Sequence, residues 1–105
     1  MVQYTTPQLT LTLPDTIDLT TMAEIYVSVR QGSTRLIKTL DDSGVSLSGT
    51  HTILATLTQE ETKLLSTTEP ATVMVNLITA GEKRIATKRK QIMIYPNDID
   101  EVIDI

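Results

Sequence analysis

The chain of 105 residues contains no cysteine, tryptophan or phenylalanine, a single histidine (His51) and only three tyrosines. Without cysteine it can form no disulfide framework, no thiolate metal site and no cysteine nucleophile. One histidine excludes a metal site built from several imidazoles and a proton relay between two of them. Three aromatic rings are too few for a surface that binds nucleic acid by stacking bases. We therefore expect no metal, no cofactor and no nucleic-acid partner.

Long apolar runs and nucleotide-binding or catalytic motifs are also missing. No stretch approaches the roughly 20 apolar residues that span a bilayer, and residues 1–6 lack the basic and apolar parts of a secretory signal. We expect a soluble protein that is made in the cytoplasm and has no membrane partner. The four glycines are isolated, and no Gly-x-Ser-x-Gly elbow occurs. Because no candidate catalytic set remains, we expect the chain not to be an enzyme.

The net charge of −4 is unevenly distributed. Residues 96–105 contain four acids and no base, namely Asp98, Asp100, Glu101 and Asp104. The rest of the chain holds nine acids and nine bases. A neutral body has no long-range field to attract a polyanion, so the acidity belongs to the C-terminal segment alone.

Threonine is in excess, at 19 of 105 residues, and this β-branched residue favours strands with one solvent-exposed face. Apolar and polar residues alternate with a period of two, which is typical of such strands. Turn residues separate the alternating segments. The pattern predicts strands at residues 8–13, 24–30, 34–40, 45–47, 51–57, 72–79 and 83–95. The predicted core comprises Ile25, Val27, Val29, Ile53, Ala55 and Leu57. In residues 72–79, Val73, Val75 and Leu77 share one face, and Met74 and Ile78 lie on the other.

The last predicted strand, residues 83–95, has an irregular pattern. Its inward-facing apolar residues stand at odd positions near Ile85 but at even positions near Ile92. Because strict alternation cannot switch in this way, we expect a β-bulge or a bend between Lys88 and Gln91. The preceding strand, residues 72–79, is largely apolar on both faces, which favours a central position in its sheet.

Thr58 is followed three residues later by Glu61, which forms a capping box and predicts one short helix. Helices and strands do not alternate, which argues against a parallel sheet. The sequence thus predicts an all-β fold: a small, antiparallel, immunoglobulin-like β-sandwich of about seven strands and one short helix. We assign residues 1–96 to this domain and residues 97–105 to an acidic, amphipathic C-terminal tail.

Two polar sites could carry chemistry but have simpler explanations. His51 could act as a general base, yet no motif supplies an orienting carboxylate and a nucleophile, so an exposed or edge-strand histidine is favoured. The run Asp41–Gly44 resembles the start of a calcium loop. Val45 and Leu47 stand where further ligands should be, which favours an ordinary turn.

Five of the nine bases lie within residues 83–90. Because a strand sends alternate side chains to opposite faces, Lys88 and Lys90 should share one side while Arg89 points to the other. A polyanion groove would need them together. The pattern favours a solvated strand whose long basic side chains keep a sheet edge from aggregating.

The acidic tail carries the predicted partner-binding residues. Asn97 could cap a helical turn, which would place Ile99, Val102 and Ile103 on one face, with Ile105 ending the chain. Such a segment suits docking into a groove on another protein, so we predict contacts through Ile99, Val102, Ile103 and Ile105. A frayed terminus, or a stripe that folds back on its own domain, is the alternative.

Four segments together resemble a group of small proteins encoded among the tail and baseplate genes of phages and prophages of Gram-positive bacteria. These segments are Thr6–Pro14, Ile25–Gly32, Leu57–Thr62 and Ala80–Arg84. The resemblance implies a structural or adaptor β-sandwich in a virion or its assembly line. It also implies synthesis in the cytoplasm of a host bacterium and possible incorporation into the virion.

The leading hypothesis is therefore a non-enzymatic module that binds other protein subunits, either further copies of itself or phage tail and baseplate proteins. The alternative is a carbohydrate-binding β-sandwich. Sugar-binding surfaces generally use flat aromatic rings, and only Tyr4, Tyr26 and Tyr95 are available. Tyr26 alternates with Ile25 and Val27, so we expect it on the exposed face.

Overall fold

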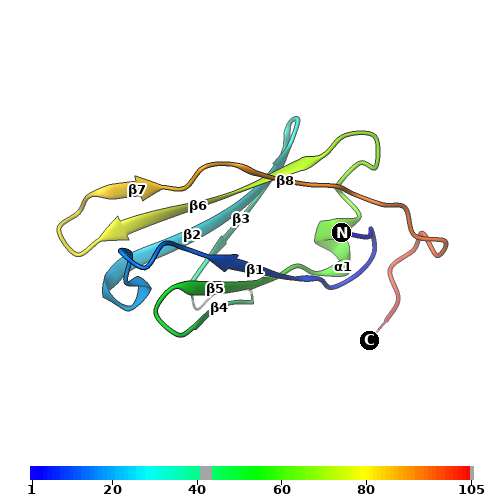
Figure 1. Cartoon of the computed structure of the whole chain (residues 1–105). Coiled ribbons are helices and arrows are strands. Elements are labelled where there is room, and N and C mark those ends of the chain that lie inside the picture. The colour runs from blue at the N-terminus through cyan, green and yellow to red at the C-terminus, as the bar shows by residue number, and fades with distance from the viewer. Residues whose placement is uncertain (41–43, 105) are drawn as a thin grey trace.

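Two antiparallel sheets face each other across one core (Figure 1). The computed structural model describes residues 1–40 and 44–104. The smaller sheet has the order β1-β5-β4, formed by β1 (Gln8–Thr12), β4 (Val45–Ser48) and β5 (Thr52–Thr56). The larger sheet has the order β3-β2-β6-β7, formed by β2 (Met22–Gln31), β3 (Thr34–Thr39), β6 (Ala71–Thr79) and β7 (Arg84–Ala86), with β8 (Lys90–Ile92) also paired to β6. The predicted all-β sandwich is confirmed.

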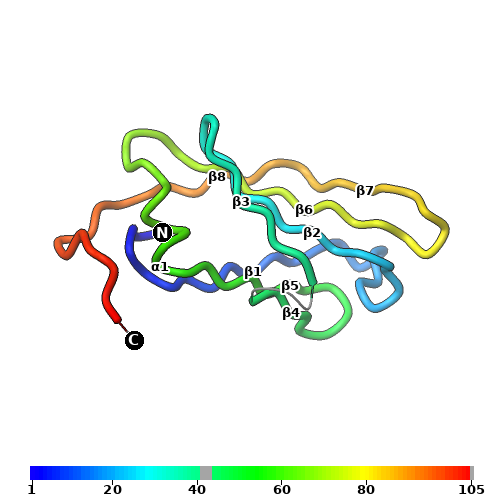
Figure 2. Tube along the Cα trace, turned by 180° about the vertical axis from the view of Figure 1, so that it is seen from behind, coloured from blue at the N-terminus to red at the C-terminus, as the bar shows by residue number. Residues whose placement is uncertain are grey.

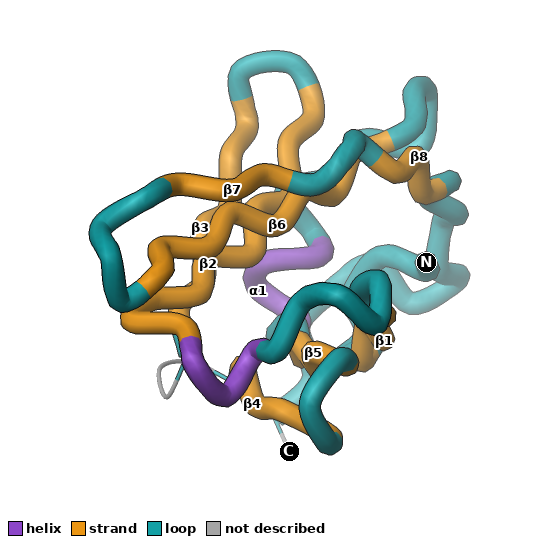
Figure 3. Tube along the Cα trace, turned by 60° about the vertical axis from the view of Figure 1, so that its left-hand side comes forward, coloured by secondary structure: helices purple, strands orange, loops and turns teal. Residues whose placement is uncertain are grey.

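Two short helical segments connect the sheets. The 3-10 turn η1 (Leu19–Thr21) precedes β2, and α1 (Gln59–Thr62) lies between β5 and β6. The capping box of α1 is confirmed: the hydroxyl of Thr58 accepts a hydrogen bond from the backbone N–H of Glu61 (3.1 Å), and the Glu61 carboxylate accepts one from the N–H of Thr58 (2.9 Å). The two layers and the position of α1 can be followed in Figures 2 and 3.

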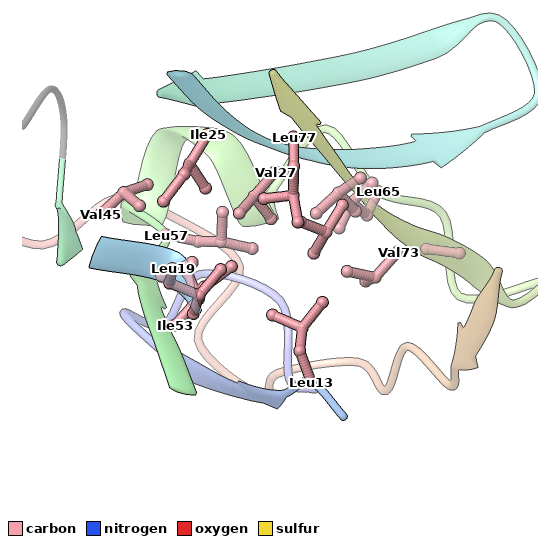
Figure 4. Packing of buried hydrophobic residues seen from close by; sticks show 14 of the residues in the cluster. Leu13, Leu19, Ile25, Val27, Val45, Ile53, Leu57, Leu65, Val73 and Leu77 are labelled. Carbon is pink, nitrogen blue, oxygen red and sulfur yellow. The ribbon is translucent and has the colours of Figure 1, made fainter. Parts of the chain in front are cut away.

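The core contains the side chains that the alternation predicted to point inward (Figure 4). All six predicted core residues are at most 2% exposed. On β6 the buried face is that of Val73, Val75 and Leu77, which are at most 3% exposed. Leu65, which follows α1, is 1% exposed and joins them. Each such aliphatic side chain stabilises the fold by roughly 1.5–3 kcal/mol relative to an exposed position.

The order of the strands matches that of an immunoglobulin-type sandwich from which the first strand has been removed. In that fold, strands B, E and D form one sheet and strands C′, C, F and G form the other. Here β1, β5 and β4 take the places of B, E and D, and β3, β2, β6 and β7 take those of C′, C, F and G. Strand A of that fold would lie beside β1, and none of the described residues forms a strand there.

The predicted long strand 83–95 is divided by an irregularity into β7 and β8. Ala86 pairs with Asn76, and Lys90 pairs with Val73. Between these two pairs, β6 has two residues and the β7–β8 segment has three, so the segment carries one extra residue. The gap lies at residues 87–89 and overlaps the predicted range. Thr87 bridges it: its N–H donates to the Val75 carbonyl (2.9 Å), and its hydroxyl accepts from the Val75 N–H (3.0 Å).

The first residues of the chain pair with the segment beyond β8. Val2 forms a parallel bridge with Tyr95, and the N–H of Gln3 donates to the Tyr95 carbonyl (2.9 Å). This contact closes the sandwich at the α1 end only, so the edge of the larger sheet along β7 stays free (Figure 1).

Candidate functional site

An open groove lies between the two sheets on the side of β1 and β7. Its volume is about 440 Å³, and most of its wall is apolar. Along the smaller sheet it is lined by Leu11, Leu13, Pro14 and Ile17; along the larger sheet it is lined by Val73, Val75, Ile85 and Ala86, with Thr87, Lys88 and Lys90 at its margin. We call this depression the edge groove. It occupies the place where the first strand of an immunoglobulin-type sandwich would cover the core.

Ile85 shows most directly that this side of the core is incompletely covered. It stands opposite Leu77 in the ladder, on the same face of the sheet. Leu77 is 0% exposed, whereas Ile85 is 37% exposed. The sequence predicted Ile85 to be inward and left open which face of β6, and so whether Leu77, is buried. Both do face inward, but the edge position leaves Ile85 without a covering strand.

Both walls of the edge groove end in free strand edges. The Lys83 carbonyl accepts a hydrogen bond from the N–H of Thr79 on β6, and the Thr87 N–H donates one to the Val75 carbonyl on β6. The backbone groups of the odd-numbered residues of β7 therefore face β6. The backbone N–H and C=O groups of Arg84 and Ala86 therefore face away from the sheet. On β1, Leu13 bonds to β5 in the same way, so the backbone groups of Thr10 and Thr12 face away. Such edges are templates for an added strand.

The basic side chains of residues 83–90 divide as the alternation predicted. Lys88 and Lys90 line the edge groove, whereas Arg89 lies on the outer face of the larger sheet. No carboxylate of the described residues lies within ion-pair distance of these three bases.

All four arginines of the chain line one shallow depression of about 260 Å³ on that outer face: Arg30, Arg35, Arg84 and Arg89. Two of them, Arg30 on β2 and Arg35 on β3, stand directly opposite each other in the ladder. Like charges in such a pair are unfavourable, so folding alone does not explain this arrangement. Alternation indicated that Arg30 points outward and that Arg89 points away from Lys88 and Lys90, but not that four arginines share one face.

A second depression, of about 320 Å³, adjoins the arginines and contains Tyr26. Its other lining residues include Glu24, Ser28, Asn76 and Arg84. The Tyr26 hydroxyl donates a hydrogen bond to the Glu24 carboxylate (2.6 Å), which raises the pKa of the Tyr26 hydroxyl. The predicted outward direction of Tyr26 is confirmed.

The C-terminal tail does not form the predicted helical turn. Residues 97–104 contain no helix. The Asn97 side chain does accept a hydrogen bond from the N–H of Ile99 (3.0 Å), as an N-cap would, and it also donates one to the Gln3 carbonyl (3.1 Å), but no helical turn follows. Three of the four predicted contact residues are described, and all are largely exposed: Ile99 at 52%, Val102 at 38% and Ile103 at 49%. Ile105 lies outside the described residues.

The tail is held to its own domain through the backbone of Ile103. The buried side chain of Gln59 on α1 donates to the Ile103 carbonyl (2.8 Å) and accepts from the Ile103 N–H (2.8 Å). One primary amide thus satisfies both backbone groups of an extended residue, as a neighbouring strand would. Sequence reasoning missed Gln59, because it read residues 58–61 only as a helix start.

His51 has a structural contact. Its Nδ1 donates to the carbonyl of Ile17 at 2.6 Å, which joins β5 to the turn before η1. The nearby carboxylate of Asp18 is exposed and accepts instead from the hydroxyl and N–H of Thr20. These hydrogen bonds lower the pKa of Asp18. His51 therefore meets neither a buried acid nor a hydroxyl among its described contacts.

The described residues, 1–40 and 44–104, contain no group of three or more side chains suited to holding a metal ion. Nor do they contain a helix of the length and apolar character that a bilayer crossing requires. The predicted turn at Asp41–Gly44 falls mostly outside the described residues.

Comparisons with protein-family models, with curated proteins and with solved structures found no match to this chain.

Proposed function

We propose that this chain is a non-enzymatic structural or adaptor protein that acts through protein–protein contacts. We further propose that it belongs to the tail or baseplate of a phage or prophage, or to the assembly of that structure. The observation that carries the first statement is the edge groove, an apolar depression between two free strand edges. The second statement rests on the sequence resemblance described above.

The mode of binding follows from the groove's construction. An extended segment of a partner subunit adds to the free edge and hydrogen bonds to the outward backbone groups of Arg84 and Ala86. Its alternate side chains enter the groove and cover Ile85. Backbone bonds give affinity in this mode, and the side chains in the groove give specificity. The partner is another protein subunit, encountered in the cytoplasm of the host bacterium or in the virion.

A pull-down with the products of the genes that flank this one tests the proposal. The variant Ile85→Glu places a charge in the edge groove, and we expect it to abolish binding of the partner. Ile37→Glu is the matched control, because Ile37 is 54% exposed on the outer face of β3, away from the groove. A chain that stays monomeric and binds none of these proteins would contradict the proposal.

A carbohydrate-binding module is the second candidate, and the outer face of the larger sheet favours it. Tyr26, Asn76 and Ser28 offer one ring and several hydrogen-bonding groups in a shallow depression beside the four arginines. Arginine binds carboxylates and phosphates in a bidentate way. The sugar chemistry that suits this face is therefore that of an acidic glycan.

A glycan array that includes uronate-containing and phosphate-containing polysaccharides tests this candidate. Binding that is lost in Tyr26→Ala and in Arg84→Gln, but kept in Ile85→Glu, would support it. An array without signal would exclude it.

A further inference from the structure

We propose that the edge groove receives residues 98–104 of a second copy of this chain as an added strand beside β7. This inference rests on the proposed function and names the partner for the same groove. The donor segment reads Asp-Ile-Asp-Glu-Val-Ile-Asp. The edge that it would join runs from Arg84, the first residue of β7, to Ile92, the last residue of β8.

The donor segment is short enough for this edge. Segment 98–104 contains seven residues and spans about 23 Å when extended. The outer side of β7 and β8 runs over nine residues, from Arg84 to Ile92, and pairs with no described strand. The first residues of the chain contact this strand only beyond that point, at Met93 and Tyr95.

The side-chain pattern of the donor segment matches the two sides of that edge. In an extended segment, Ile99, Glu101 and Ile103 fall on one face, and Asp98, Asp100, Val102 and Asp104 fall on the other. The first face carries two isoleucines toward the edge groove, where Ile85 is only partly covered, and brings Glu101 to the lysines at its margin. The second face carries three aspartates toward the outer side of the sheet, where Arg84 and Arg89 lie.

The charges on both partners are available for this contact. The five bases of residues 83–90 form no ion pair with any described carboxylate, and the four acids of the tail form none with any described base. In the single chain the two groups are also far apart. The tail leaves the domain at the α1 end, whereas β7 extends toward the opposite end in both Figure 1 and Figure 2.

This separation is why the donor must be a second copy. A tail that points away from its own groove can fill only the groove of a neighbour, so the contact is head-to-tail and joins two different surfaces. Repetition of such a contact closes into a ring or extends as a filament. The donor tail must first release the two hydrogen bonds between Ile103 and Gln59. Gln59 therefore opposes the exchange.

Complementation between two defective copies tests the inference with the full chain. One copy carries Ile85→Glu in the groove, and the other carries Ile99→Asp with Ile103→Asp in the tail. In sedimentation velocity, we expect the wild-type chain to associate with rising concentration, and each variant alone to associate at least about tenfold more weakly. Mixing the two should restore a one-to-one dimer and nothing larger, because only one intact groove and one intact tail remain.

Disulfide trapping gives an independent readout, since the natural chain has no cysteine. We expect a copy with Ile85→Cys to crosslink to a copy with Ile99→Cys or Ile103→Cys under mild oxidation. A copy with Ile37→Cys on β3 is the control and should not crosslink to either. Gln59→Ala, which frees the tail, should increase trapping.

Two results would overturn the inference. One is a chain that stays monomeric up to millimolar concentration and gives no crosslink. The other is association that persists unchanged in the tail variant. Neither result by itself contradicts the proposed function. That proposal is contradicted only if the chain also binds none of the proteins encoded by the flanking genes.

Discussion

Lys38 on β3 and Glu61 in the first turn of α1 form an ion pair of 2.9 Å at the edge of the core. The Lys38 side chain is only 3% exposed and that of Glu61 24%. The same carboxylate accepts from the N–H of Thr58 in the capping box. The pair therefore ties the larger sheet to the segment that follows the smaller one.

Glu61→Gln tests how strongly this pair supports the fold. Glutamine preserves the shape and can still close the capping box, so the change removes the charge alone. We expect the free energy of unfolding to fall by about 2 kcal/mol, because a hydrogen bond between ionised groups is lost beside a buried ammonium. Urea denaturation measures the change. Glu60→Gln, at the exposed neighbouring position, should change stability by less than about 0.5 kcal/mol; equal effects of the two variants would contradict the prediction.

The same pair predicts a dependence of stability on pH. Burial raises the pKa of Glu61, but the hydrogen bonds from Lys38 and from Thr58 outweigh burial, and the pKa lies below its ordinary value of 4.5. A lowered pKa in the folded state means that the stabilisation is complete above the ordinary value and is lost as the pH falls through the lowered one. We expect the stabilities of the wild type and Glu61→Gln to differ at neutral pH and to converge in acid, once the pH falls below the lowered pKa of Glu61. Urea denaturation at a series of pH values checks this, and a difference that stays constant would refute it.

Gln59→Ala should release the C-terminal tail from the domain. The expected result is loss of amide hydrogen-exchange protection at Ile103, because its N–H then has no acceptor within the domain. Unfolding free energy should fall by only about 1 kcal/mol, the contribution of ordinary hydrogen bonds. Glu60→Ala, on the same helix, is the control. Continued protection of the Ile103 amide in Gln59→Ala would show that another contact holds the tail.

The turn between β6 and β7 predicts a stabilising substitution. Glu82 has a φ of 63°, in the left-handed region that glycine adopts more readily than other residues. Glu82→Gly should therefore raise the melting temperature, with a gain of about 0.5–1 kcal/mol. Gly81→Ala is the matched control. Gly81 has no positive φ, and its added Cβ would meet only the Thr79 hydroxyl, at an ordinary 3.8 Å. We therefore expect alanine to be tolerated there, with a gain of about 0.4–1 kcal/mol from the reduced freedom of the unfolded chain. A melting temperature that falls in Glu82→Gly would contradict the assignment of strain.

Leu77 and Ile85, which face each other across β6 and β7, should differ in their contribution to stability. Leu77→Ala opens a cavity in the closed core and should lower the free energy of unfolding by about 3 kcal/mol. Ile85→Ala should lower it by only about 1 kcal/mol, because the side chain is already partly solvated. Guanidinium denaturation of dilute protein makes the comparison. Equal losses would mean that Ile85 is covered in the isolated chain.

Most of the fold could be predicted from local pattern. The two-residue alternation identified all seven strand regions and the buried set of β2 and β5, because side-chain direction along a strand is a property of neighbouring residues. It did not indicate which of the two apolar faces of β6 is buried. The parity change between Ile85 and Ile92 predicted the irregularity at residues 87–89 for the same reason. The capping box of Thr58 and Glu61 was also predictable, since both of its hydrogen bonds join residues three positions apart.

The candidate site was predictable only in fragments. Alternation separated Lys88 and Lys90 from Arg89, but it could not indicate that Arg30 and Arg35, which lie far away in the chain, share the face of Arg89. The tail shows the limit more clearly. A helical pattern in residues 97–103 was the local expectation, yet Asn97 and Ile103 bond to Gln3 and Gln59 instead.

By itself the sequence determined that this chain forms strands with one apolar face, and it determined which residues that face contains. Tertiary structure alone decided which strands became edges, where the core stayed open and that Gln59 holds Ile103 across 44 positions of the chain. The physical reason is that alternation records only which side of a strand is buried. The identity of a strand's neighbour depends on the pairing of distant segments. Among the described strands, that pairing is complete except beside β1, β7 and β8 and at the outer edges of β3 and β4.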